Sequence, residues 1–260
     1  MNRRKLLADN ALIFRRSVRE GLRDPGPAFV LPLLPPLLLT IVFIALFERL
    51  AELPAFGGGQ YVDYLAPGAV LLTAVLGAGF TSTSLAQDVR GGYMDRLRLL
   101  PARPTAFITG RLGFESVRVL PAATIVLAVA LALGAALETG LVGAVVVVAL
   151  ACLLSAAYSG LFYAVALATR SPDTAVALQP LGLVVGFLST ALVPDETMPG
   201  WAATVARFNP VSVVVDGARE VMLGTLWSDE LAAGIGVCLV LIALTEGATA
   251  TLFRARITRS

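Results

Sequence analysis

Long runs of apolar, uncharged residues alternate with shorter polar segments along this chain. Five of the runs contain no charged residue, and in a sixth Glu246 is the only one. Each run has at least 19 residues, and a helix that rises about 1.5 Å per residue needs about 20 to cross a hydrocarbon layer about 30 Å thick. The pattern therefore predicts six membrane-spanning helices, at residues 28–47, 64–86, 119–137, 141–169, 174–194 and 231–253.

The composition is that of a membrane protein. Charged residues make up 15% of the 260 residues and hydrophobic residues 57%, whereas soluble proteins carry about 25% charged residues. The predicted spans leave room only for loops and short helices. We therefore expect an all-α polytopic membrane protein, with a single transmembrane domain over residues 1–260 and no soluble catalytic domain.

Several chemistries are excluded by what the sequence lacks. It has no histidine, which removes the usual general base, the imidazole metal ligand and the Ser-His triad. It has no phosphate-binding loop of the form G-x-x-x-x-G-K-[ST], and its one lysine is Lys5. Cys152 and Cys238 lie inside apolar runs and are interpreted as buried apolar residues. We expect no catalytic site, metal or cofactor in this chain, and a net charge of +2 does not favour nucleic acid as a partner.

Lysine and arginine residues are distributed unevenly between the two sides that six spans define. Seventeen lie in segments 1–27, 87–118, 170–173 and 254–260, and three lie in segments 48–63, 138–140 and 195–230. Cytoplasmic loops carry the excess of basic residues in membrane proteins. We therefore expect both termini to lie in the cytoplasm.

The segment before the first span has the pattern of a basic amphipathic helix, over residues 1–25. Its apolar stripe runs from Leu7 through Ala11, Phe14 and Val18 to Leu22, and Arg15, Arg19 and Arg23 form a neighbouring row. Such a helix lies on the inner membrane surface, and the Asp-Pro-Gly-Pro sequence at 24–27 ends it. It is either a topology anchor or a collar that contacts a partner.

The cytoplasmic loop at residues 88–104 contains a short amphipathic segment between helix breakers. Met94, Leu97 and Leu100 share one face at helical spacing. A helix this short has no core in which to bury that face, so we expect it to dock into another protein. The alternative is a loop helix that dips into the lipid headgroups. The segment consists of Gly91, Gly92, Tyr93, Met94, Asp95, Arg96, Leu97, Arg98, Leu99, Leu100 and Pro101.

Four charged residues are expected at membrane depth. Arg111, Glu115 and Arg118 share a helix face at the start of the third span, and Glu246 lies in the sixth span, about 10 Å from its inner end. Charges at that depth must pair or reach water. We predict a structural pair between Glu246 and the face with Arg111, and a proton relay through Glu246 is the alternative.

The external segment at residues 195–230 is predicted to re-enter the membrane without crossing it. Its apolar stretches carry four charged residues, too many for a span. Two short helices joined at Asn209 and Pro210 would satisfy both facts. Trp201 and Trp227 are then interfacial anchors.

These features together resemble the type-2 ABC exporter permeases, and within them the daunorubicin-resistance permease group. The resemblance rests on six spans in 260 residues, the basic N-terminal helix, the Gly-Gly-x-x-Asp-Arg-Leu-Arg-Leu-Leu-Pro loop, and Met-Pro-Gly-Trp followed by Phe-Asn-Pro-Val before the last span. It implies that Gly91 to Pro101 form a coupling helix seated in a separately encoded ATPase, which would bind ATP and Mg²⁺. It also implies that the ATPase is flanked by Arg15, Arg16, Arg19 and Arg23.

The same resemblance implies an external gate and an assembly. The gate would be the re-entrant pair, with Pro199, Trp201, Asn209 and Pro210. Such permeases are half-transporters, so two copies of the chain, forming a homodimer in the membrane lipid, would work with two ATPase subunits. The chain itself would not be an enzyme.

Residues in two spans are candidates for a substrate path: Thr81, Ser82, Thr83 and Ser84 in the second span, and Gln179, Phe187 and Ser189 in the fifth. Hydroxyl groups of this kind also bond back to their own helix, and the sequence leaves both interpretations open. The Gly-x-x-x-Gly spacing of Gly182 and Gly186 fits packing within the chain or between two copies.

A hydrophobic or amphiphilic substrate, a drug or a lipid, is the favoured cargo of export. A permease for a lipid-linked polysaccharide is the alternative, less favoured because the second and fifth spans offer few aromatic rings, namely Tyr64, Phe80 and Phe187. From another class, an ion-coupled secondary transporter would use Glu246, but the sequence shows no inverted repeat. An intramembrane protease would lack its base.

Overall fold

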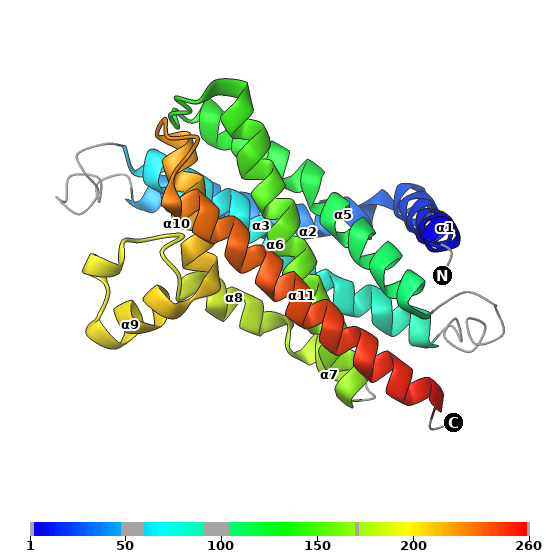
Figure 1. Ribbon diagram of the computed structural model, residues 1–260. Helices are drawn as coiled ribbons and strands as arrows, with labels where there is room; N and C mark the ends of the chain where they lie inside the picture. The colour runs from blue at the N-terminus through cyan, green and yellow to red at the C-terminus, as the bar shows by residue number, and fades with distance from the viewer. Residues whose placement is uncertain (1–2, 48–59, 91–103, 170–171, 259–260) are drawn as a thin grey trace.

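The computed structural model of the 260-residue chain describes residues 3–47, 60–90, 104–169 and 172–258. All regular secondary structure in these residues is helical (Figure 1), which confirms the predicted all-α fold. The elements are α1 (Arg3–Arg23), the π-helical turn η1 (Gly26–Val30), α2 (Leu31–Phe47), α3 (Tyr61–Arg90), α5 (Pro104–Ala132), α6 (Gly140–Thr169), α7 (Pro172–Ala177), α8 (Gln179–Phe187), the 3₁₀ turn η4 (Asp195–Thr197), α9 (Gly200–Phe208), α10 (Pro210–Met222) and α11 (Asp229–Thr258).

Five helical segments are long and apolar enough to cross a membrane: Ala28–Phe47, Tyr61–Phe80, Leu112–Ala132, Gly140–Thr169 and Asp229–Leu252. They correspond to five of the six predicted spans. The remaining one, predicted at 174–194, is a broken helix in which α7 ends at Ala177 and α8 runs from Gln179 to Phe187. The break follows from Pro180, which has no amide to donate to the helical ladder. Only five continuous spans are therefore found in the described part of the chain.

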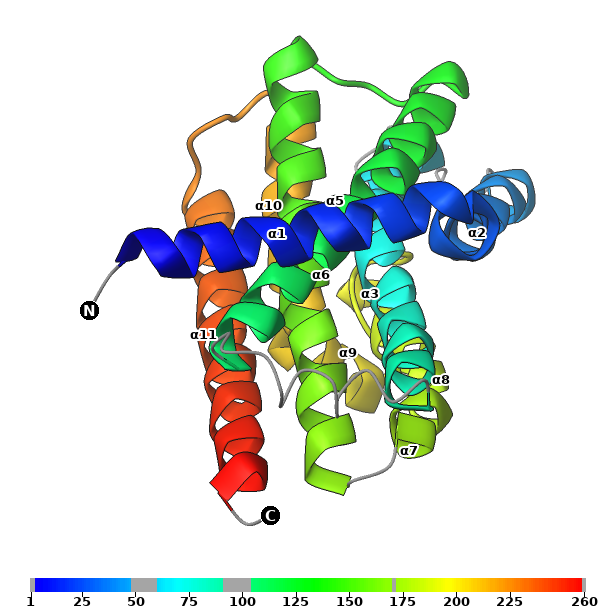
Figure 2. The ribbon, with the colours of Figure 1, turned by 90° about the vertical axis from the view of Figure 1, so that its right-hand side faces the viewer.

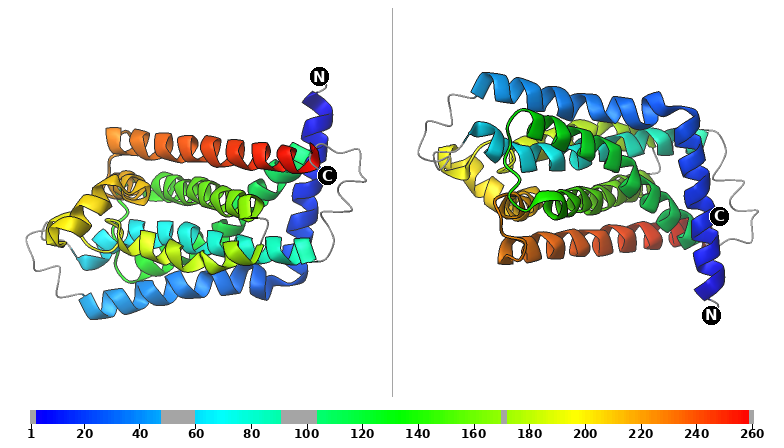
Figure 3. Two further views of the ribbon diagram at one scale, coloured as in Figure 1. Left: turned by 90° about the horizontal axis from the view of Figure 1, so that it is seen from below. Right: turned by 90° about the horizontal axis from the view of Figure 1, so that it is seen from above.

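The helix α3 runs through the middle of the bundle. Of the residues in its apolar segment, 83% are buried. In the corresponding segments of α2 and α11 the share is 17% each. Views from below and above show α2 and α11 at opposite edges, with α3 and α6 between them (Figure 3). The two edge helices therefore present most of their apolar side chains outward, as helices do at a lipid boundary.

The chain after α8 folds back onto the first half of α3. The Tyr61 hydroxyl donates to the carbonyl oxygen of Leu192 at 2.9 Å, and the Tyr64 hydroxyl donates to that of Thr190 at 2.9 Å. At Gly68 the two backbones touch, because a Cβ there would collide with the carbonyl group of Ala191. This return segment is thus held against the bundle core at the residues that link α8 to η4.

The Gly-x-x-x-Gly pair of α8 faces α3 of the same chain. A Cβ on Gly182 would lie 3.3 Å from the carbonyl oxygen of Val75, and a Cβ on Gly186 would lie 2.5 Å from Cδ2 of Leu72. Both glycines are buried. Of the two interpretations that the sequence leaves open, the structure supports close packing within the chain.

The first helix lies across the bundle rather than along it (Figure 2). Its packed face includes Ser17 and Gly21, and a Cβ on Gly21 would lie 3.0 Å from the Phe114 ring of α5. These small residues let α1 approach α5 closely, so the packed face is centred on them. Leu22, expected on the apolar stripe, is therefore 66% exposed. The helix ends at Arg23, directly before the Asp-Pro-Gly-Pro sequence that was expected to break it.

Candidate functional site

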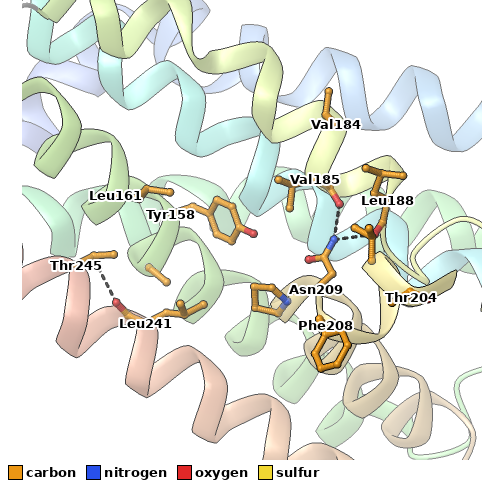
Figure 4. A pocket seen from close by; sticks show the side chains of 13 residues that line it. Tyr158, Leu161, Val184, Val185, Leu188, Thr204, Phe208, Asn209, Leu241 and Thr245 are labelled. Atoms are coloured by element: carbon orange, nitrogen blue, oxygen red, sulfur yellow. Dashed lines mark hydrogen bonds between the residues drawn. The ribbon is translucent and has the colours of Figure 1, made fainter. Parts of the chain in front are cut away.

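An apolar cavity of about 580 Å³ lies where α6, α8, α9, α10 and α11 meet (Figure 4). None of the residues that line it is charged. Three polar side chains at its wall already have partners, since the Thr204 hydroxyl donates to Gly200 O at 2.9 Å and the Thr245 hydroxyl to Leu241 O at 2.8 Å, and Asn209 is also bonded. The lining consists of Ala157, Tyr158, Leu161, Val184, Val185, Leu188, Thr204, Val205, Phe208, Asn209, Pro210, Leu241 and Thr245.

Asn209 holds the cavity wall together. The predicted pair of short helices is present, with α9 ending at Phe208 and α10 beginning at Pro210. Between them Asn209 caps α10, because its side-chain oxygen accepts the amide of Val211 at 2.9 Å. Its side-chain nitrogen donates to the carbonyl oxygens of Val185 at 2.7 Å and Leu188 at 2.9 Å. One amide therefore joins the end of α8 to the link between α9 and α10.

A second, polar cavity of about 340 Å³ lies on the other side of the same link. Arg219 of α10 pairs with Asp216 at 2.7 Å, donates to Thr190 O at 3.0 Å, and lies over the Tyr64 ring at 3.9 Å from its centre. Arg207 of α9 pairs with Asp195 at 2.8 Å at the rim. Sequence reasoning did not single out this cluster, although the spacing of Asp216 and Arg219, three residues apart on one helix, is a usable signal.

The residues predicted for an external gate separate into two sets. Asn209 and Pro210 line the apolar cavity. Pro199, which directly precedes α9, and Trp201, which is 66% exposed, are not among the residues that line it. Trp227 is 93% exposed. Both tryptophans thus lie on the protein surface, where an interfacial anchor would have to be.

Among the residues predicted for a substrate path, the described side chains of Gln179, Phe187 and Ser189 do not line this cavity. Thr81, Ser82, Thr83 and Ser84 lie in the described helix α3, but their side chains are outside the described residues. The Gln179 side chain donates to the carbonyl oxygen of Gly79. The Ser189 hydroxyl is buried and donates to Gly186 O at 2.6 Å, and the Phe187 ring packs 6.0 Å from that of Phe43. The residues that α8 and the turn after it contribute instead are Val184, Val185 and Leu188.

The buried charges form a pair within one helix. Arg118 Nε lies 2.8 Å from Glu115 Oε2, and Arg118 also donates to Gly77 O of α3 at 2.8 Å. The pair is buried, with Glu115 1% and Arg118 9% exposed. Among the described side chains Glu246 makes no ion pair and is half-buried in α11, while the side chain of Arg111 is outside the described residues.

The two surfaces predicted to meet a partner are described only in part. Residues Gly91 to Pro101 are outside the described residues, but the helices on both sides are described: α3 ends at Arg90 and α5 begins at Pro104. The four arginines of α1 line one outer surface of that helix, where Arg16 pairs with Glu20 at 2.7 Å. This surface is formed by Leu12, Arg15, Arg16, Arg19, Glu20 and Arg23.

The fold and the site define a multi-pass helical membrane protein with an apolar, partly open cavity between its helices. Residues 10–223 match the family model described as ABC-2 type transporter, and the chain belongs to that family. It is therefore a non-catalytic transmembrane permease subunit of an ABC transporter, whose ATPase is a separate protein.

Two relatives are similar over most of the chain. One is the daunorubicin resistance ABC transporter permease protein DrrB1 of Streptomyces coeruleorubidus, with 27% identity over 87% of this chain and 81% of the relative. Another, from Mycobacterium tuberculosis, is named "Probable doxorubicin resistance ABC transporter permease protein DrrC", with 26% identity over 84% of this chain and 76% of the relative. Both are permease subunits by name.

Proposed function

We propose that this permease exports a hydrophobic or amphiphilic molecule, such as a drug or a lipid, across the cell membrane with energy from a separate ATPase subunit. The observation that carries the proposal is the cavity of about 580 Å³, whose described lining residues include no charged side chain. The names of the two relatives support the same class of cargo, because both refer to resistance to an anthracycline drug.

The route of energy transfer is proposed from the helices beside the cytoplasmic loop. ATP and Mg²⁺ would bind to the ATPase, and the segment from Gly91 to Pro101 would dock into it. The helices α3 and α5 lie directly before and after this loop, and Arg118 ties them together at Gly77 O. A docked loop could therefore move two joined helices as one body, and we expect two permease copies and two ATPases in the working transporter.

Two surfaces complete the proposed arrangement. The arginines of α1 would form a cationic collar at the inner membrane surface beside the ATPase, since all four line one outer surface of the helix. The pair α9 and α10 would close the pathway on the external side. The excess of basic residues on the side of both termini supports a cytoplasmic location for them.

A lipid-linked polysaccharide fits this cavity less well. A sugar chain offers many hydroxyl groups, each of which needs a hydrogen-bonding partner when it leaves water. The cavity provides two aromatic rings, Tyr158 and Phe208, and three of its four polar side chains already have partners. An apolar cargo needs no such partners.

The proposal is tested by purifying the tagged permease from its native membranes in mild detergent, followed by mass spectrometry and an ATPase assay of the eluate. We expect a soluble subunit with a Walker A sequence at a one-to-one ratio and vanadate-sensitive turnover. A permease that elutes alone or only with itself would contradict the proposal.

Leu97→Asp is expected to lower the amount of copurified ATPase at least tenfold. The change places a charge on the apolar face that we propose docks into the ATPase, and burying an unpaired carboxylate is costly. The matched control is Leu223→Asp, which introduces the same charge at an exposed residue after α10, on the proposed external side. Equal copurification of the two variants would show that the loop is not the docking element.

Glu246→Gln is expected to lower the folded yield more than it changes the pH dependence of transport. A single carboxylate at membrane depth suits a structural contact better than a relay, which needs further titratable groups. Glu230→Gln, at the start of the same helix, serves as the control. A pH profile that shifts with Glu246→Gln at normal yield would favour the ion-coupled alternative.

A further inference from the structure

The Tyr158 hydroxyl is the one polar group in the apolar cavity that makes no hydrogen bond within the described residues. Two other tyrosines of the bundle behave differently, since Tyr61 and Tyr64 each donate to a backbone carbonyl. Tyr158 is only 8% exposed. The hydroxyl oxygen nevertheless borders the open space of the cavity and is not sealed among other side chains, and phenylalanine would fill the same space without offering a polar group there.

The Tyr158 hydroxyl is oriented so that it could bond to a molecule in the cavity. Tyr158 lies on α6, and Figure 4 shows its ring between Leu161 and Val185 with the oxygen directed toward the side of the cavity where Val185 and Asn209 lie. The side-chain nitrogen and oxygen of Asn209 are occupied by three backbone groups. A molecule in the cavity would therefore meet one side chain with an available hydrogen-bond donor, the Tyr158 hydroxyl, in an otherwise apolar wall.

We infer that this cavity binds the uncharged, apolar part of an amphiphile, and that the Tyr158 hydroxyl selects an apolar body carrying a neutral oxygen, such as a carbonyl, ether or hydroxyl group. The cavity of about 580 Å³ lies within the range of about 300–1,000 Å³ that is typical of small-molecule sites. A charged group would find no counter-charge among the lining residues, so it must stay outside. Calling the occupant the exported substrate rests on the proposed function, whereas the binding itself does not.

The binding test uses the full-length permease in lipid nanodiscs, without an ATPase, and two neutral fluorescent probes. Nile red carries a carbonyl oxygen, whereas diphenylhexatriene is a pure hydrocarbon. Saturable binding is measured above the signal of protein-free nanodiscs. Tyr158→Phe is expected to weaken Nile red binding about threefold to tenfold, the usual effect of one hydrogen bond, and to leave diphenylhexatriene binding unchanged.

A second pair of variants tests the location. Val184→Trp adds bulk to a residue that lines the cavity and should abolish saturable binding of both probes. Leu183→Trp adds similar bulk to the adjacent residue of α8, which is 42% exposed and does not line the cavity, and should leave binding unchanged. Size-exclusion profiles confirm that each variant is folded.

The outcomes separate this inference from the proposed function. Normal binding by Val184→Trp, or no saturable Nile red binding by the native chain, overturns the site. Equal effects of Tyr158→Phe on the two probes overturn the role of the hydroxyl. If the probes bind as expected but no ATPase copurifies, the site stands and the proposed exporter fails. If an ATPase copurifies and no probe binds, the site alone fails.

Discussion

Glu115→Leu is expected to destabilise the permease by about 3–5 kcal/mol, the usual cost of removing one partner of a buried ion pair. Glu115 and Arg118 are nearly inaccessible and lie 2.8 Å apart. Without the carboxylate, the Arg118 guanidinium loses the partner that lies 2.8 Å away and keeps its charge inside the bundle, because arginine does not lose its proton in proteins. The folded yield and the unfolding transition in mixed detergent measure the effect.

Two further variants separate burial from pairing. Arg118→Met removes the other partner of the pair together with the hydrogen bond to Gly77 O, so it should also destabilise the permease. Arg207→Met is the surface control: its pair with Asp195 has the same 2.8 Å distance, but the Arg207 side chain is 69% exposed, and such pairs contribute about 0–1 kcal/mol. Similar losses for Glu115→Leu and Arg207→Met would contradict the buried pair.

Much of the fold could be predicted because the signals are local. A run of twenty apolar residues has few alternatives to a membrane helix, and proline or glycine at a fixed place ends a helix whatever surrounds it. The end of α1 at Arg23 and the junction of α9 and α10 at Asn209 were predicted from such residues. The burial of Glu115 and Arg118 is consistent with the prediction that charges beside an apolar run must pair.

The rest depended on which face of a helix meets which neighbour. The apolar sequence at 174–194 does not show that Pro180 breaks the helix rather than bending it. Ser189 was a sensible candidate for a polar path, but its hydroxyl bonds to Gly186 O in the turn that ends α8. Tyr158 could not be singled out, because a single tyrosine in an apolar span is expected to be an ordinary core residue until the side chains around it are known.

The partner of Arg118 shows the same limit. The sequence analysis predicted that Glu246, from a distant helix, pairs with the helix face that carries Arg111, Glu115 and Arg118. In the structure the nearer carboxylate pairs with Arg118, while Gly77 of α3 supplies a backbone oxygen. A backbone carbonyl has no signature in the sequence, so a tie between α3 and α5 becomes visible only once the helices are packed.

Asn209→Asp is expected to cause the second large loss of stability, because it removes two hydrogen bonds of the Asn209 side chain and keeps one. The remaining carboxylate oxygen can still accept the Val211 amide, so the cap of α10 survives. The carbonyls of Val185 and Leu188 lose their donor and face an oxygen instead. Each buried carbonyl left without a donor costs about 1–3 kcal/mol, and the end of α8 should separate from the link between α9 and α10.

Two comparisons make this result specific. Asn209→Ser also lacks the two donors but adds no charge, so it should be less destabilising than Asn209→Asp. Thr204→Val removes a hydroxyl that lines the same cavity and bonds to its own helix at Gly200 O, and should have little effect.

The measurements are the unfolding transition, proteolysis of the segment between α8 and α10, and Nile red binding. Because Asn209 joins α8 to the rest of the cavity wall, all three should change together in Asn209→Asp. An aspartate variant that unfolds normally but loses Nile red binding would mean that Asn209 contacts the ligand rather than holding the wall.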